Sequence, residues 1–203
     1  MLQNDKWIKR QSSINGMIAP FCPTLIRQVE YCSLIETGIS RKVISYGTSS
    51  YGYDIRLSPN DFRVFRHIPG TVINPKSFNP DNLHSVELQE DEDGSFFILP
   101  GHSYGLGVSL ELVRMPENIT ALCLGKSTYA RAGIIVNTTP IESAWSGHIT
   151  LEFSNSSNAD CRIYANEGVC QLLFLEGEPC EVSYEDRKGK YQNQGHEVTL
   201  ARV

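Results

Sequence analysis

Long hydrophobic runs are missing from this 203-residue sequence: no stretch approaches the roughly 20 apolar residues that a membrane-spanning helix needs. Near the N-terminus, the charged residues Asp5, Lys6, Lys9 and Arg10 interrupt any hydrophobic segment of the signal-peptide type. We therefore expect a soluble, cytoplasmic protein without a membrane partner.

Cysteine and histidine patterns typical of metal sites are also missing. The six cysteines include no CxxC pair, and none has the spacing to histidine that zinc sites show. We therefore expect no metal bound by protein side chains. Because cytoplasmic thiols are kept reduced, we expect free cysteines rather than disulfides.

Positive charge is not in excess. The 18 lysines and arginines against 23 aspartates and glutamates give a formal net charge of −5 at pH 7, which repels nucleic-acid polymers and anionic lipids. A nucleic-acid polymer is therefore not an expected partner. A small phosphorylated ligand stays possible, because a few cations in a pocket can reverse the local field.

Long amphipathic helices between strands are absent too, which argues against TIM-barrel and Rossmann organisations. Instead, short apolar or alternating segments recur between turn residues, at 96–99, 104–112, 119–123, 134–136, 149–153 and 169–175. Many short strands at this spacing are typical of a sandwich or barrel. The sequence predicts a single all-β, jelly-roll-like domain over residues 1–203.

The other segments complete this organisation. We expect short helices at 4–12 and within 125–133, and mostly loops, with an edge strand, at 17–45. Residues 74–94 are expected to form a solvated surface loop, because they are acidic and rich in Asn and Pro.

Two parts of the chain have a more specific expectation. From Tyr104 to Leu112, every second residue is apolar or aromatic, which predicts one strand with one buried face. Residues 1–40 would form an N-terminal helix and loops, and 184–203 a C-terminal lid or tail.

The segment 125–133 could bind an anion. It leaves a strand at Gly125 and offers Lys126, two hydroxyl groups and Arg131. On a helical turn, Ser127 and Arg131 face the same way, and free backbone amides at the helix start would help the cations to hold phosphate. The alternative is an ordinary surface helix capped by Ser127 or Thr128.

A glutamate stands inside the predicted strand around 148–155. Period 2 places Ile149, Leu151 and Phe153 in the core. The opposite face would then carry the polar residues His148, Thr150, Glu152 and Ser154. Because Glu is depleted in strand interiors, Glu152 lies either on a solvated sheet face or in a cavity that uses its proton affinity.

Two further features concern ligand recognition. Gln171 interrupts an apolar run, so its amide needs partners, either on a wet sheet face or at the polar edge of a base. Near the C-terminus, three cations fall within the four residues 187–190. This segment is either a mobile tail or, with Tyr184, Lys190 and Gln194, a lid that closes over a nucleoside triphosphate.

Together these segments resemble the dCTP deaminase family, relatives of the trimeric dUTPases. The resemblance spans about residues 40–200 in family order. It is carried by Ser45-Tyr46-Gly47, Ser49-Ser50-Tyr51-Gly52-Tyr53-Asp54, Gly125-Lys126-Ser127-Thr128-Tyr129-Ala130-Arg131, Trp145 with Gly147, Thr150-Leu151-Glu152-Phe153-Ser154-Asn155, Gly168-Val169 with Gln171, and Ser183-Tyr184 leading to Gly189-Lys190-Tyr191-Gln192.

The resemblance implies a distorted jelly-roll or β-barrel of the dUTPase-like type, assembled as a homotrimer with active sites between subunits. It implies deamination of dCTP to dUTP and ammonia, with Mg²⁺ bound through the triphosphate and dTTP as an inhibitor. By family role, Glu152 is the general base, and Ser127 and Arg131 belong to the catalytic loop. The implied substrate contacts come from Lys126, Ser127, Thr128, Tyr129, Ala130, Arg131, Thr150, Leu151, Glu152, Gln171, Tyr184, Lys190 and Gln194.

Most cytosine deaminases use zinc, and their signature is H-x-E with a downstream P-C-x-x-C. Here no histidine is followed two residues later by glutamate, and Pro179-Cys180 has Ser183 where the second cysteine should stand. Water would then be activated by Glu152 alone. A nearby Arg131 would keep Glu152 ionised, and Ser127 could orient the water or stabilise developing charge.

Three alternatives stay open. The chain could be a dUTPase or a bifunctional enzyme that also releases pyrophosphate, in which case Glu142 is the carboxylate of interest. It could also be a nucleotide-binding β module without catalytic activity.

Overall fold

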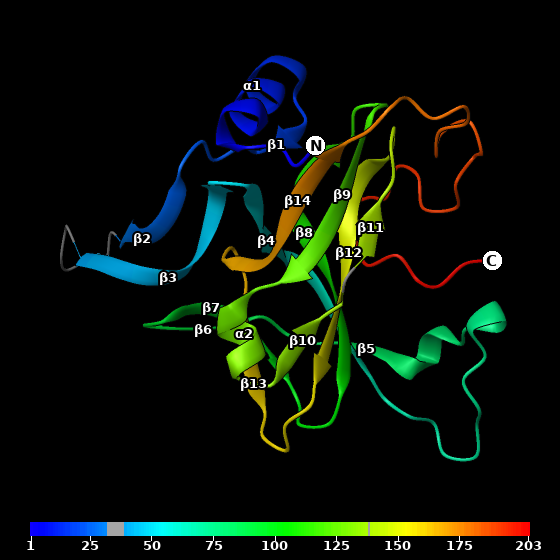
Figure 1. Ribbon diagram of the computed structural model, residues 1–203. Helices are drawn as coiled ribbons and strands as arrows, with labels where there is room; N and C mark the ends of the chain where they lie inside the picture. The colour runs from blue at the N-terminus through cyan, green and yellow to red at the C-terminus, as the bar shows by residue number, and fades with distance from the viewer. Residues whose placement is uncertain (32–38, 138) are drawn as a thin grey trace.

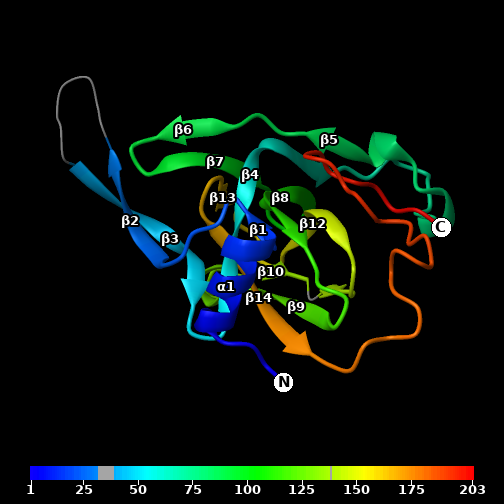
Figure 2. The ribbon, with the colours of Figure 1, turned by 90° about the horizontal axis from the view of Figure 1, so that it is seen from above.

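The computed structural model of the chain describes residues 1–31, 39–137 and 139–203. Its main feature is an antiparallel sheet of eleven strands that curls around the hydrophobic core (Figures 1 and 2). Seven strands follow one another across it in the order β10 (Ile134–Val136), β12 (Ser146–Asn155), β8 (Tyr104–Arg114), β4 (Gly52–Phe65), β14 (Gly168–Glu176), β9 (Ile119–Gly125) and β11 (Thr139–Ile141).

Four more strands extend this sheet. β1 (Ile18–Ala19) pairs with β8, and β5 (Leu83–Ser85) pairs with β4. β2 (Leu25–Tyr31) pairs with β3 (Ile39–Ser49), which pairs in turn with β4. The β2–β3 pair extends away from the rest of the sheet (Figures 1 and 2).

A second, smaller sheet closes the core. It has the order β13 (Cys161–Tyr164), β7 (Gly94–Leu99) and β6 (Gln89–Asp91). Phe97 of β7 stacks on Phe62 of β4, with ring centroids 5.0 Å apart, and Phe62 also meets Phe153 of β12 at 5.5 Å. These rings are almost fully buried, so the two sheets are joined by the apolar contact that drives folding. The architecture confirms the all-β class expected from the sequence.

The helices are short, as expected. α1 (Asp5–Asn15) begins at Asn4, whose side-chain oxygen accepts a hydrogen bond from the Trp7 amide at 3.1 Å. It ends at Gly16 with φ 62°, a left-handed conformation that glycine adopts without strain. Because Gly16 is this cap, the helix runs three residues beyond the predicted 4–12. α2 (Ser127–Arg131) lies within the predicted 125–133.

Residues 17–45, expected as loop with an edge strand, contain more strand than predicted, and residues 74–94, expected as a surface loop, also contain strands. Residues 17–45 include β1, β2 and part of β3, although 32–38 lie outside the described residues. Residues 74–94 contain the 3-10 turns η1 (Pro75–Ser77) and η2 (Pro80–Asn82) as well as β5 and β6. Backbone pairing with β3, β4 and β7 stabilises these strands, and such pairing with distant residues leaves little trace in local composition.

The expectation of one buried face along β8 is wrong: residues 105–109 are buried on both faces, and beyond them the other residues of the alternation are buried. Val108 is fully buried, as predicted, but Leu110 and Leu112 are only half-buried, while Glu111 and Val113 are inaccessible. The pairing with β12 shifts register between His148 and Thr150, which lie opposite Leu112 and Val108. Three residues of β8 (109–111) thus lie opposite the single residue Ile149, and this irregular pairing interrupts the regular alternation of the strand.

Five of the six cysteines, all except Cys32, lie in the described residues, and these five carry free thiols. Cys32 is outside the described residues. No helix in the described parts of the chain is long and apolar enough to cross a lipid bilayer.

Candidate active site

A cavity of 490 Å³ lies between β8, β12 and the C-terminal segment. Glu152 and Thr150 of β12 form part of its wall, together with Tyr104 of β8. The C-terminal segment contributes Tyr184, Lys190, Tyr191, Gln194 and Thr199–Ala201. The cavity therefore joins Glu152 to the three residues of this segment that are predicted to contact substrate, Tyr184, Lys190 and Gln194.

The backbone of β12 determines which side chains reach this cavity. Glu152 lies opposite Leu106 of β8 in a regular antiparallel register, so alternate residues point to opposite faces. Leu151 and Phe153 are buried, whereas Thr150 and Glu152 are half-buried. The alternation predicted from Ile149 to Ser154 is confirmed. Glu152 lies in the wall of a cavity and not on an open, solvated sheet face.

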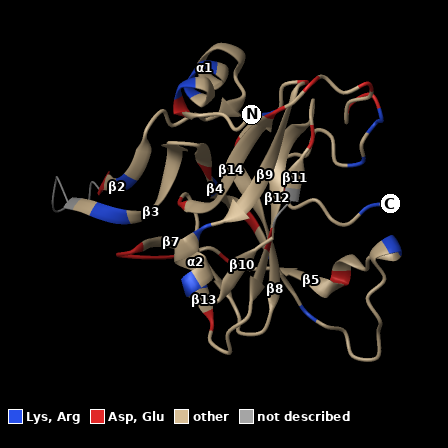
Figure 3. Cartoon of the chain, in the orientation of Figure 1, with Lys and Arg blue, Asp and Glu red and all other residues tan. Residues whose placement is uncertain are grey.

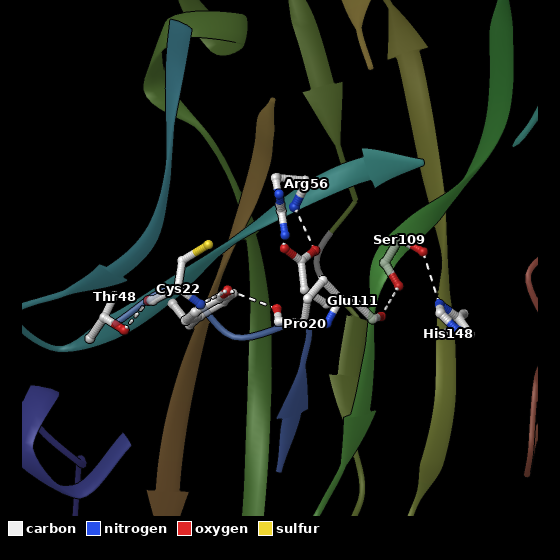
Figure 4. Close-up of polar contacts among 8 residues, drawn as sticks. Pro20, Cys22, Thr48, Arg56, Ser109, Glu111 and His148 are labelled. Atoms are coloured by element: carbon white, nitrogen blue, oxygen red, sulfur yellow. Dashed lines mark hydrogen bonds and ion pairs between the residues drawn. The ribbon is translucent and has the colours of Figure 1, made fainter. Parts of the chain in front are cut away.

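His148 does not share the face of Thr150 and Glu152, contrary to the sequence prediction. It is only 4% exposed, and its Nδ1 lies 3.0 Å from the carbonyl oxygen of Ser109 (Figure 4). The physical reason is the register shift beside it, which strict period-2 reasoning does not include.

Tyr104 is a cavity residue that sequence reasoning treated only as part of a strand. Burial, together with the negative charge of Glu152, raises the pKa of Tyr104 to about 12. The phenol therefore stays protonated at neutral pH and can donate a hydrogen bond inside the cavity. Most other residues around it are apolar, including Phe65, Phe78 and Leu83.

The C-terminal segment is folded against the cavity by specific hydrogen bonds. The Trp145 indole donates to the Tyr191 carbonyl at 2.7 Å, and the Thr150 hydroxyl donates to Gln194 Oε1 at 2.8 Å. Gly189 packs so closely on Tyr184 that a Cβ there would lie 2.1 Å from the ring. The segment is thus folded against the cavity wall, and lysines and arginines recur along it (Figure 3).

Glu142 lies at the edge of the same cavity. Its carboxylate forms an ion pair with Arg187 of the C-terminal segment, and both side chains are about half exposed. The cavity thus contains a second carboxylate besides Glu152.

Lys126, directly before α2, belongs to a separate polar cluster. Lys126 Nζ lies 2.5 Å from Asp54 Oδ2 and 3.0 Å from the Ser45 hydroxyl. Gln171 Nε2 donates to Asp54 Oδ1 at 2.8 Å and to the Ser49 hydroxyl at 3.1 Å. Asp54, which is 3% exposed, therefore fixes both Lys126 and Gln171. Sequence reasoning quoted Asp54 without recognising this role.

Helix α2 does not start as expected. Its N-cap is Lys126, with an extended backbone and no capping side chain, so the expected cap at Ser127 or Thr128 is wrong. Both of these residues are exposed, and so are Ala130 and Arg131. The Arg131 guanidinium donates to the Ser127 carbonyl at 3.1 Å.

Two of the implied contact residues have buried side chains. Tyr129 is 3% and Leu151 2% exposed, and the Tyr129 hydroxyl accepts a hydrogen bond from the Tyr164 amide at 2.8 Å. In this chain both side chains pack into the core, so only their main-chain atoms could meet a ligand.

The predicted site residues thus form two groups within one chain. Glu152, Thr150, Tyr184, Lys190 and Gln194 line the cavity. The residues of the string 126–131, together with Gln171, are not among the described residues that line it.

A family model described as dCTP deaminase-like matches residues 4–177. The chain belongs to this family. It is 48% identical to the dCTP deaminase of Azoarcus sp. (strain BH72) over 203 residues, covering 100% of this chain and 99% of the relative. It is 47% identical to the dCTP deaminase of Xylella fastidiosa (strain M12) over 205 residues, covering 100% and 99%.

A solved structure supports the fold of this dCTP deaminase-like chain. The crystal structure of 2'-deoxycytidine 5'-triphosphate deaminase from Agrobacterium tumefaciens matches with a TM-score of 0.55 at 14% identity. The match covers 87% of this chain and 48% of the other, so this chain spans about half the length of that protein.

Proposed function

We propose that the protein hydrolyses dCTP to dUTP and ammonia, with Glu152 as the general base. The observation that carries the proposal is the position of Glu152, half-buried in the wall of a cavity that Tyr184, Lys190 and Gln194 also line. It is supported by relatives named dCTP deaminase that are 47–48% identical over the full chain.

The reaction needs two proton transfers. Glu152 takes one proton from water while the water oxygen forms a bond to C4 of cytosine, and it passes this proton to ring N3. The second proton of the same water, now on the C4 hydroxyl, moves to the amino group; the C4–N bond then breaks, ammonia leaves and uracil remains with its C4 carbonyl and N3–H. Tyr104, kept protonated by its raised pKa, is a hydrogen-bond donor beside this carboxylate.

No zinc is required in this proposal. The sequence lacks the H-x-E and P-C-x-x-C signature of zinc deaminases, and the described residues contain no group of three or more His, Cys, Asp or Glu side chains arranged to hold a metal. If 1,10-phenanthroline abolishes activity in the presence of excess Mg²⁺, this part of the proposal is wrong.

The triphosphate would lie toward the C-terminal segment. Lys190 lines the cavity and offers a cation to phosphate oxygens. Mg²⁺ bound through the triphosphate fits this end of the cavity, because Glu142 supplies a carboxylate oxygen of the kind that Mg²⁺ accepts beside phosphates and water. The ion would neutralise phosphate charge.

We further propose that the site is completed between subunits of a homotrimer. Ser127 and Arg131 are exposed on α2 and do not line the cavity of their own chain, so a neighbouring copy could supply them.

The test is complementation between the variants Glu152→Gln and Ser127→Ala. If each site combines two chains, co-refolding the inactive variants at equal amounts should restore about a quarter of wild-type activity, because about one site in four receives both intact residues. A mixture that stays inactive would contradict the shared site.

Product analysis tests the reaction itself. We expect incubation with dCTP and Mg²⁺ to release ammonia and dUTP. Because Glu142 is a second carboxylate in the same cavity, a bifunctional reaction that also releases pyrophosphate is the second candidate. Measuring ammonia and pyrophosphate in one reaction separates the two, and binding of dCTP without either product would indicate a nucleotide-binding module. dTTP, added as a competitor, tests the expected inhibition.

A further inference from the structure

The C-terminal segment is attached to β12 directly before Glu152. The amide of His148 donates to the Gln194 carbonyl at 2.9 Å, and the Thr150 hydroxyl donates to Gln194 Oε1 at 2.8 Å. The Thr199 amide in turn donates to the Thr150 hydroxyl at 3.1 Å. The position of Gln194 at the cavity therefore depends on how this segment lies against residues 148–150.

A pair of histidines lies at this attachment. The ring of His148 on β12 and the ring of His196 on the C-terminal segment have centroids 3.9 Å apart, with 43° between their planes. His148 is 4% exposed, whereas His196 is exposed. The segment thus covers a buried imidazole with a second imidazole.

The orientation of His148 is fixed from the other side (Figure 4). A carbonyl oxygen only accepts hydrogen bonds, so Nδ1, 3.0 Å from the Ser109 carbonyl, must carry the hydrogen. The Ser109 hydroxyl is also engaged, because it donates to the Glu111 carbonyl at 2.7 Å and accepts from the Ile149 amide at 2.8 Å. A second proton on His148 can therefore only enter at Nε2.

The nearby carboxylates of Glu111 and Asp61 would not neutralise a positive charge on His148, because each is already paired with an arginine. On β8, the Glu111 carboxylate is turned toward Arg56 of β4, whose Nε lies at 2.7 Å (Figure 4). On the C-terminal segment, the negative charge of Glu197 contributes to the raised pKa of Arg63. Asp61 is paired with Arg63 at 2.7 Å and accepts the Val198 amide at 2.9 Å. The ionisable group that acts on His148 is His196 itself.

We propose that His148 and His196 are positioning residues, which hold Gln194 at the cavity while the buried His148 imidazole is uncharged. A proton on His148 would place a charge in a buried site that faces a second imidazole and, among the described residues, no carboxylate, and moving the C-terminal segment away from β12 would expose that charge to water. Only the consequence for nucleotide binding rests on the proposed function.

The direction of the pH effect follows from burial. Burial lowers the pKa of His148, as does the neighbouring His196, while the Ser109 carbonyl opposes this shift. With the segment undocked, both lowering influences weaken, so the undocked form binds a proton more readily than the docked form. Docking is therefore complete above the ordinary histidine pKa of about 6.5 and is lost as the pH falls below it.

Trp145 reports this docking without any substrate, because its indole donates to the Tyr191 carbonyl of the same segment. The chain has two tryptophans, so a Trp7→Phe background leaves Trp145 as the only tryptophan, and its emission is excited selectively over that of tyrosine. We expect its fluorescence to change between pH 7.5 and 5.5.

His196→Phe keeps a ring against His148 but cannot titrate, and His148→Asn keeps an amide donor for Ser109. His148→Asn should remove the transition, and His196→Phe should move it to lower pH, because His148 stays buried but loses its ionisable neighbour. His67→Gln, at an exposed histidine in a loop, should leave it unchanged. A flat wild-type titration, or the same transition in both pair variants, would overturn the proposal.

A second measurement separates positioning from a structural role. For the wild type, we expect the KM for dCTP to rise at least about threefold from pH 7.5 to 6, with a smaller change in kcat at saturation, because protonation acts on segment docking. In His196→Phe the KM should rise less over the same pH range. If the protein does not deaminate dCTP, the fluorescence titration still decides the histidine proposal. If KM is constant while kcat falls equally in wild type and His196→Phe, the pair does not position Gln194.

Discussion

Asp54→Asn is the substitution whose cost can be worked out most directly from the structure. Asp54 is 3% exposed and accepts hydrogen bonds from Lys126 and Gln171. Asparagine has the same shape, but one of its two acceptor oxygens becomes an NH₂ group that would face another donor. The Lys126 ammonium, with a side chain 11% exposed, would then lack its carboxylate partner.

Removing one partner of a buried ion pair costs about 3–5 kcal/mol. Because Lys126 keeps the Ser45 hydroxyl at 3.0 Å, we expect the lower end, about 3 kcal/mol. For a chain of this size, the melting temperature falls by about 2–4 °C per kcal/mol, so the expected decrease is about 6–12 °C.

Thermal unfolding followed by circular dichroism measures this decrease. The matched control is Asp5→Asn, which breaks an exposed Lys9–Asp5 ion pair within α1 and should change the melting temperature far less. The double variant Asp54→Asn/Lys126→Met removes the unpaired cation and should recover at least part of the loss. A decrease no larger than that of the Asp5→Asn control would refute the idea that Asp54 anchors this cluster.

Three other predictions concern activity. Glu152→Gln should lower kcat by about 10²-fold or more, because the base is lost, with dCTP binding still detectable by calorimetry; near wild-type turnover would refute the role of Glu152. Removing Mg²⁺ with EDTA should lower activity because the triphosphate charge is no longer screened, whereas 1,10-phenanthroline with excess Mg²⁺ should leave activity intact. Deleting residues 184–203 should weaken nucleotide affinity more than it lowers the melting temperature, and a deletion variant that does not fold would show that the segment is structural.

Much of the candidate site follows from local sequence. Period 2 from Ile149 to Phe153 is sufficient to place Leu151 in the core and Thr150 with Glu152 on the opposite face, because neighbouring side chains of a strand alternate wherever the register is regular. Asn4 and Gly16 likewise determine the ends of α1 through interactions within a few residues of each other.

Tertiary structure decided the features that join distant parts of the chain. The alternation of Leu110 and Leu112 predicted the wrong buried face, because an irregular pairing with β12 lies between them and Val108. The same shift buries His148, and the register of two strands depends on both of them.

The sequence by itself determined the all-β class and which residues could serve as base, cation or amide. Only the folded chain decided that Asp54 joins Lys126 to Gln171 and that His196 covers His148. Contacts of this kind pair residues that lie tens of positions apart, and they form only when the whole core is packed. Local periodicity carries no information about such partners, so their chemistry could be named from the sequence but their pairing could not.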